Sequence, residues 1–136
     1  IKVERDENIS DEIKLTGLEV DKTSNATSLP GNLTVSNTLK LQGSENLASG
    51  NAANLSVTAS YFTTTGASTA TLAAGSAGQI KTFMMVADAG DMVITVTNAG
   101  WGGSGTMTFN DQGDGCTLQY IDSKWYCIGN NGVTFG

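Results

Sequence analysis

Two turns of this chain hold pairs of carboxylates, the side chains best suited here to acid–base chemistry. Asp88 and Asp91 flank one glycine-bearing turn, and Asp111 and Asp114 flank another. A glycosidase needs two carboxylates about 5–9 Å apart across a groove, and one of them must stay protonated in a poorly solvated setting. Aspartates beside glycines in turns are well solvated and bond to their own backbone. We therefore predict turn formation at these positions, not catalysis.

The second of these turns also holds hard oxygen ligands of the kind that Ca²⁺ prefers. Asn110, Asp111 and Asp114, with nearby backbone carbonyls, are weak candidates for such a site. Their spacing does not match the EF-hand loop, because no glutamate closes it. Turn formation is the stronger interpretation, and we expect neither a bound metal nor a cofactor.

The chain contains no histidine and has a net charge of −6. Histidine-based general bases, Ser–His and Cys–His pairs and the commonest zinc sites are therefore excluded, and we expect a protein that is not an enzyme. Beyond Lys40 the only basic residues are Lys81 and Lys124, too few for the cationic face that nucleic acid requires. No apolar run approaches the roughly 18 residues of a membrane span. Neither nucleic acid nor a membrane is expected as a partner.

The two cysteines lie on either side of a tight turn at residues 122–123. A two-residue hairpin there pairs Leu118 with Cys127 and leaves Cys116 diagonal to Cys127, with Cα atoms about 7–8 Å apart. A disulfide usually needs roughly 4.4–6.8 Å between these atoms. Unless a bulge shifts the register, we predict two free, buried thiols.

Three aromatic residues are candidates for a binding surface. Trp125 and Tyr126 are consecutive on a predicted strand, so their side chains point to opposite faces. We expect one to anchor the core and the other to reach a subunit interface or a ligand. Trp101 lies in a glycine-rich loop, where a large ring either packs over the end of a sheet or contacts a partner. Packing or an oligomer contact is favoured there over stacking on a sugar.

Residues 67–136 alternate between short β-rich runs and turns that contain glycine, aspartate or asparagine. No window of 10–12 residues has a helical period free of glycine, and short turns favour antiparallel neighbours over parallel crossovers. We predict an all-β fold, an antiparallel sandwich or jelly-roll-like body with an extended N-terminal arm. The predicted strands lie near residues 68–73, 79–87, 91–97, 105–109, 116–121, 124–129 and 132–135.

The front of the chain differs in composition from this body. Residues 1–22 hold more than half of the charged side chains, and their apolar members form no clean helical stripe. They are either a solvated terminus or an arm that becomes ordered against a neighbour. We divide the chain into an extended N-terminal arm and β-rich linker, residues 1–66, and an antiparallel β domain, residues 67–136. The interface candidates within the arm are Ile9, Ile13, Leu18 and Val20.

The linker contains a short sequence echo. Residues 32–36 (NLTVS) are followed 22 residues later by residues 54–58 (NLSVT). Alternation of apolar with small polar side chains is what a strand packed on one face requires, and the same pattern recurs in intertwined trimeric fibres. Two copies are too few to establish a repeat architecture.

The composition also favours association between copies. Only 39% of the residues are hydrophobic and 15% are charged, so a single copy buries few large side chains and should be marginally stable. Subunit association or docking on a larger surface would supply the missing stability. We predict an oligomer.

Several short motifs of the body resemble a known group of proteins. They are Gly78 to Thr82, Gly90-Asp91, Val96 to Asn98, Gly105 to Phe109, Asp111, Gly113-Asp114, Ser123 to Trp125 and Ile128 to Gly132. Over roughly residues 60–133 the chain is similar to a C-terminal β module of virion structural proteins from tailed phages, especially those that infect marine cyanobacteria and other marine bacteria. This resemblance implies a homotrimeric component of the virion exterior, such as a capsid decoration protein or a fibre, in contact with the major capsid protein or another virion protein.

Our first hypothesis is therefore a non-enzymatic virion structural protein, a homotrimeric capsid decoration or cement protein. An alternative is a tail or head fibre that binds host glycans, with Trp101 and the acidic turns lining the site. A further alternative is a self-assembling extracellular filament subunit, in which residues 1–22 donate a strand to the next copy.

Overall fold

The computed structural model describes residues 34–41 and 43–136. The chain divides into a unit of Ile1–Leu39 and a compact unit of Lys40–Gly136, and every strand below belongs to the second unit. The described residues form nine strands and no helix. Accordingly, no helix in this part of the chain is long and apolar enough to cross a membrane.

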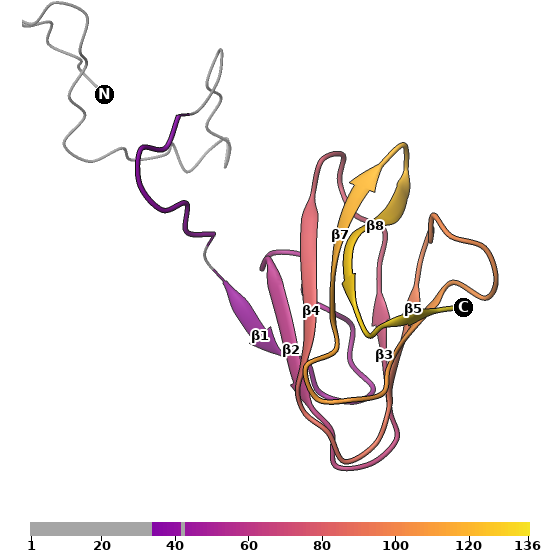
Figure 1. Cartoon of the computed structure of the whole chain (residues 1–136). Helices are drawn as coiled ribbons and strands as arrows, with labels where there is room; N and C mark the ends of the chain where they lie inside the picture. The colour runs from indigo at the N-terminus through magenta and orange to yellow at the C-terminus, as the bar shows by residue number, and fades with distance from the viewer. Residues whose placement is uncertain (1–33, 42) are drawn as a thin grey trace, which may run out of the picture. The chain divides into compact units, whose positions relative to one another are not determined.

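The nine strands form a sandwich of two sheets (Figure 1). Sheet A contains, side by side, β1 (Ser44–Asn46), β2 (Ala59–Thr63), β4 (Ile80–Ala87), β7 (Gly115–Ile121) and β8 (Lys124–Asn131). Sheet B contains, in order, β3 (Ser68–Leu72), β5 (Met92–Val96), β6 (Thr106–Phe109) and β9 (Thr134–Phe135). The all-β fold and the sandwich are confirmed. The strands β3 to β9 match the seven predicted runs within two residues at each end.

The expectation of purely antiparallel sheets was wrong, because both sheets are mixed. β1, β2 and β4 are parallel to one another, and so are β3 and β5. Each loop from β2 to β5 carries the chain from one sheet to the other, so a strand's neighbour within its sheet is two strands away in sequence. Packed sheets lie about 10 Å apart, a gap that a short turn can cross. Short loops therefore join parallel neighbours here without a helical crossover.

The first half of the body is thus a coil that winds between the two sheets. Ser60 on β2 pairs with Phe83 on β4, 23 residues later. Ser68 on β3 pairs with Met92 on β5, 24 residues later. An isolated parallel bridge between Ala52 and Thr71 extends the coil backwards on the side of sheet B. The 22-residue echo in the sequence is close to the length of one such coil.

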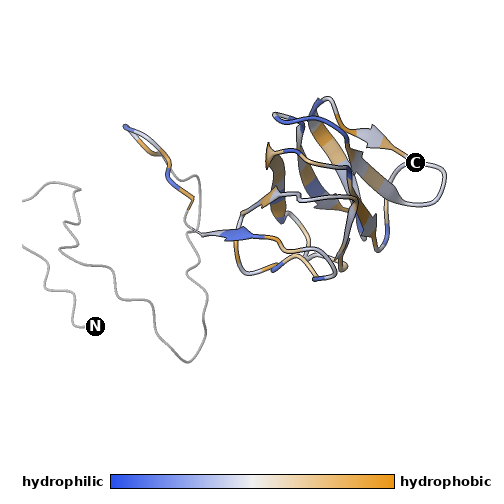
Figure 2. Ribbon diagram, turned by 90° about the horizontal axis from the view of Figure 1, so that it is seen from below, coloured by the Kyte–Doolittle hydropathy of each residue, from blue (hydrophilic) through white to orange (hydrophobic). Residues whose placement is uncertain are grey.

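The core lies between the sheets because apolar side chains alternate along each strand. On β4, Phe83 and Met85 are fully buried, while Met84 between them is exposed. The hydrophobic positions alternate in the same way along other strands (Figure 2). Trp125 is the largest fully buried side chain, and its indole nitrogen donates a hydrogen bond of 2.9 Å to the carbonyl of Ala73. This tryptophan joins β8 to the loop that follows β3.

Strands β1 and β2 lie inside the stretch predicted as arm and linker, residues 1–66. Both pair within sheet A, and the compact unit begins at Lys40. The region between Lys40 and residue 66 is therefore part of the sandwich. The predicted division at residue 66 itself stays a prediction.

Candidate interaction surface

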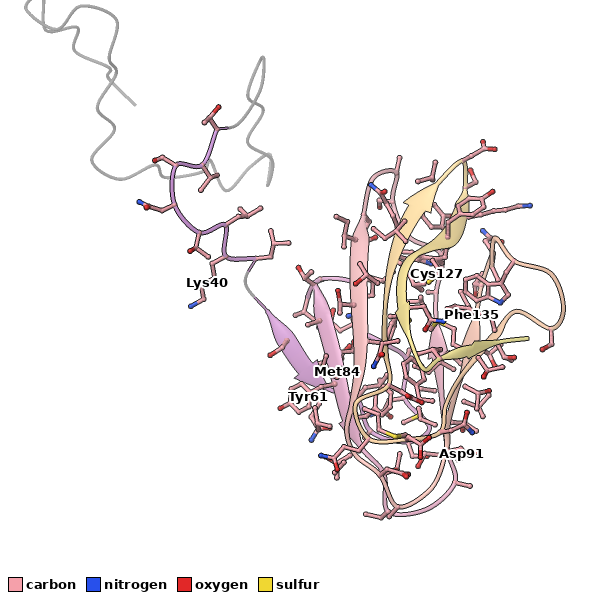
Figure 3. All side chains as sticks on the ribbon, in the orientation of Figure 1. Lys40, Tyr61, Met84, Asp91, Cys127 and Phe135 are labelled. Atoms are coloured by element: carbon pink, nitrogen blue, oxygen red, sulfur yellow. The ribbon has the colours of Figure 1, made fainter. Side chains whose placement is uncertain are left out.

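The outer face of sheet A carries the exposed large hydrophobic side chains of the β body. Tyr61 on β2 and Met84 on β4 are register partners, and they lie next to each other on this face (Figure 3). Alternation places Ile80, Val86 and Ile121 on the same side, and Ile128 lies on the edge strand β8 beside its bulge. All six are between 38% and 55% exposed. Monomers rarely leave such side chains grouped on one surface without a partner.

The same face is nearly free of charge. Among its described outward positions only Lys124, the first residue of β8, is charged. The aspartates of the body lie in turns at the ends of the strands, between β4 and β5, β6 and β7, and β7 and β8. Docking of a partner on this face would bury little charge, so the desolvation cost would be low.

Trp101 lies against the C-terminal strand and is half-buried. Its ring makes an edge-to-face contact with Phe135, with 4.8 Å between ring centroids. Among the described residues nothing accepts a hydrogen bond from its buried Nε1. The packing interpretation of this residue matches the structure, and the ring offers only part of its surface to a sugar.

Trp125 and Tyr126 point to opposite faces, as their spacing predicts. Trp125 is buried and packs edge-to-face on Tyr120, with 5.0 Å between ring centroids. Tyr126 is half-buried on the outer side of sheet A, where it pairs with Gln119. Trp125 is therefore a core residue, and Tyr126 is the member of the pair that can contact a partner.

The turn that holds Asn110, Asp111 and Asp114 is closed by its own side chain. The carboxylate oxygen Oδ2 of Asp114 accepts backbone hydrogen bonds from Asn110 (2.8 Å) and Asp111 (3.1 Å). Gly132 packs so tightly on this carboxylate that a side chain there would collide with it. The weak calcium candidates thus serve turn formation. In the described part of the chain no group of three or more His, Cys, Asp or Glu side chains is placed to hold a metal.

The two pairs of turn aspartates lie at the same end of the sandwich. The side-chain amide of Asn110 donates to Oδ2 of Asp91 over 3.1 Å, which links the β6–β7 turn to the β4–β5 turn. The backbone nitrogen of Gly90 donates to Oδ1 of Asp88. Asp88, Asp91 and Asp114 therefore all make turn-closing contacts.

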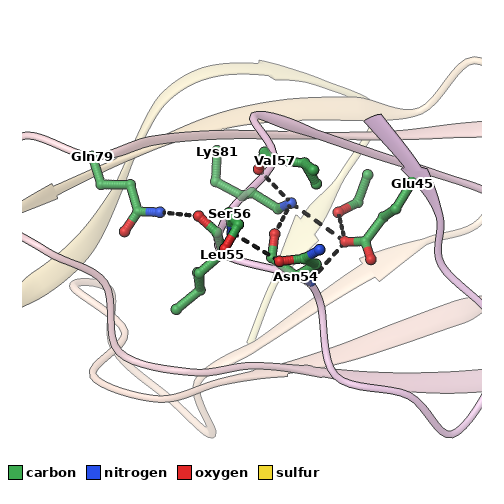
Figure 4. A network of polar contacts seen from close by, with 8 residues as sticks. Glu45, Asn54, Leu55, Ser56, Val57, Gln79 and Lys81 are labelled. Atoms are coloured by element: carbon green, nitrogen blue, oxygen red, sulfur yellow. Dashed lines mark hydrogen bonds and ion pairs between the residues drawn. The ribbon is translucent and has the colours of Figure 1, made fainter. Parts of the chain in front are cut away.

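Sequence reasoning missed the best-connected polar group of the body, Lys81 (Figure 4). Its side chain is fully buried, and its Nζ donates to the carbonyls of Asn54 (2.8 Å) and Val57 (3.0 Å) and to Oε1 of Glu45 (3.4 Å). The alternation of β4 could have revealed it, because Lys81 falls on the same side as Phe83. The lysine fixes the loop that precedes β2 and is structural.

Both cysteines are free. The predicted pairing of Leu118 with Cys127 is confirmed, but a bulge between Thr117 and Leu118 places Cys116 opposite Asn130. Cys116 is buried and Cys127 is half-buried, so only one of the two predicted buried thiols is fully enclosed. Burial, with a smaller contribution from Cys127 nearby, raises the pKa of Cys116 to about 12.

The remaining interface candidates, Ile9, Ile13, Leu18 and Val20, lie outside the described residues. No protein-family model and no curated protein matches this chain. The fold and the surface define a two-sheet β sandwich that presents one charge-poor, partly apolar sheet face. Its described residues show neither a metal cluster nor a grouped catalytic set.

Proposed function

We propose that this protein is a non-enzymatic virion structural protein, a homotrimeric capsid decoration protein on the particle exterior. The observation that carries the proposal is the outer face of sheet A, where six exposed hydrophobic side chains lie almost without charge. Such a face suits a protein whose task is contact with other protein surfaces. The location on a virion rests on the resemblance of residues 60–133 to the phage β module.

The framework around this face favours a holding role over chemistry. The aspartates suited to acid–base chemistry cap turns, and the one fully buried lysine binds backbone carbonyls. A sandwich with a closely packed core changes shape little when a partner binds. These features support a rigid body that adds contact area to an assembly.

The mechanism we propose is mechanical. Copies bound across the seams between capsid subunits add apolar and hydrogen-bonded contact to the closed shell. Because these contacts exist only in the assembled shell, binding stabilises it by mass action. The expanded or ruptured shell loses the contacts and so becomes less favourable.

The test is to remove the protein from purified particles and measure shell rupture on heating or at low salt. We expect stripped particles to rupture at a lower temperature than untreated ones, and re-addition of the full chain should restore the original temperature. Unchanged rupture after complete removal would contradict the cementing role. An image of the native particle with the protein only on tail or head fibres would favour the glycan-binding alternative.

A further inference from the structure

The outer face of sheet A has two halves of different shape. The half formed by β2 and β4 is bulky, because Tyr61, Ile80 and Met84 project from it. The half formed by β7 and β8 is flat, because Gly115 and Gly129 supply no side chain there. A methyl group added at Gly129 would meet no atom within 4 Å. The face thus joins a ridge to a shallow surface of similar length.

We infer that this face binds a second copy of this chain, with the bulky half of one copy packed on the flat half of the other. Projecting Tyr61 and Met84 need a partner surface without side chains of their own, and the glycines of β7 and β8 provide one. A surface that carries both members of such a pair is complementary to itself, as contacts in symmetric oligomers must be. The inference rests on the self-association part of the proposed function and does not depend on the capsid.

Charge favours a second copy as the occupant. Two copies of a chain with a net charge of −6 repel each other, so they associate best where no carboxylate lies in the contact. The outer face of sheet A meets this condition, because its one charged residue, Lys124, is a cation at one end of β8. The ends of the strands, where Asp88, Asp91 and Asp111 lie in turns, do not.

The size of the face sets the expected strength of the contact. Five strands spaced about 4.8 Å apart, each with about five residues in contact, give a face of roughly 400 Å². A stable interface buries about 800 Å² on each partner. The face alone therefore predicts weak association. Three more exposed hydrophobic side chains, Val35, Leu39 and Leu41, are available in the full chain to add to it.

The test is sedimentation velocity of the full chain over a range of concentrations, with two variants in the face and two matched controls. Met84→Asp places a charge on the bulky half, and Gly129→Leu fills the flat half. Thr95→Asp makes the same kind of change on the outer side of sheet B, where Thr95 is exposed. Gly66→Leu adds the same side chain in the β2–β3 loop, where an added Cβ also meets nothing within 4 Å. Thermal unfolding checks that all four variants fold.

We expect Met84→Asp and Gly129→Leu each to weaken association at least tenfold, while both controls associate like the unmodified chain. Unchanged association in the two face variants would overturn the inference, and so would equal weakening in all four proteins. If the face variants still associate but no longer bind stripped particles, the face belongs to a capsid partner. That result would overturn the inference and leave the proposed function standing.

Discussion

The ammonium group of Lys81 lies 3.4 Å from the carboxylate of Glu45, and the lysine is fully buried while the glutamate is about one-fifth exposed. The pair joins β4, in the middle of sheet A, to the edge strand β1. Two backbone carbonyls complete the hydrogen bonds of the ammonium. Loss of one partner from such a group costs more than the pair contributes, because the other partner is left buried without a counter-ion.

Lys81→Met should therefore lower the free energy of unfolding by about 3 kcal/mol, since it leaves the Glu45 carboxylate and two carbonyls without their donor. The matched control is Lys124→Met, which removes a lysine that is exposed and should change stability by less than about 0.5 kcal/mol. Urea unfolding of the two variants and the unmodified chain measures both effects. Equal stability of the two variants would contradict the structural role of Lys81.

The ion pair also predicts how stability depends on pH. Burial raises the pKa of Glu45, but hydrogen bonds from Ser60 and the Asn54 backbone, with the charge of Lys81, lower it further, so the net pKa lies below the ordinary 4.5. A carboxyl group whose pKa is lowered by folding contributes stability that is complete above its unfolded pKa and is lost as the pH falls through the folded pKa. Burial lowers the pKa of Lys81, and this lysine stays protonated throughout the acid range.

We therefore expect Glu45→Gln to be less stable than the unmodified chain near neutral pH, with the difference shrinking as the pH falls below 4.5. Urea unfolding at a series of pH values between about 6 and about 3 measures this difference. A difference that stays constant over the whole range would show that the charge of Glu45 does not stabilise the fold.

Gly75 is needed because two aromatic rings pack on the backbone there. A Cβ at Gly75 would lie 2.5 Å from Cζ2 of Trp125 and 3.0 Å from Cγ of Tyr120. Gly75→Ala should therefore cost about 2 kcal/mol of stability, because the rings must shift within a closely packed core. Gly66→Ala is the matched control, since nothing lies within 4 Å of its added Cβ. If both variants unfold at the same temperature, the packing described around Trp125 is wrong.

The thiols should differ in reactivity. The raised pKa of Cys116, about 12, leaves almost no thiolate at pH 8, and the side chain is enclosed. A thiol reagent should therefore modify one cysteine in the folded chain and two after denaturation. Cys127→Ser should abolish the fast reaction, whereas Cys116→Ser should leave it unchanged. Rapid modification of Cys116 in the folded state would contradict its enclosure.

Much of the fold could be predicted because the alternation in this chain is local. The runs around Phe83 and Ile94 place every second side chain in the core, and glycine- or aspartate-bearing turns mark their ends. The order of the strands could not be predicted in the same way. A short turn between β2 and β3 fits either an antiparallel hairpin or a passage to the opposite sheet, and only packing of the whole body decides between them.

The candidate surface was predictable only in part. Trp125 and Tyr126 were correctly placed on opposite faces from their spacing alone. The grouping of Tyr61 with Met84 could not be foreseen, because β2 and β4 become neighbours only through the parallel coil. Lys81 shows the reverse case, since its place between apolar core positions marked it as buried but gave no indication of its partner.

The central claim is that this chain is a self-assembling structural protein. Sedimentation equilibrium of the full chain tests it most directly. We predict an assembly with a mass three times the 14.0 kDa of one chain, which dissociates on dilution. A single species of 14.0 kDa at every concentration would contradict the account.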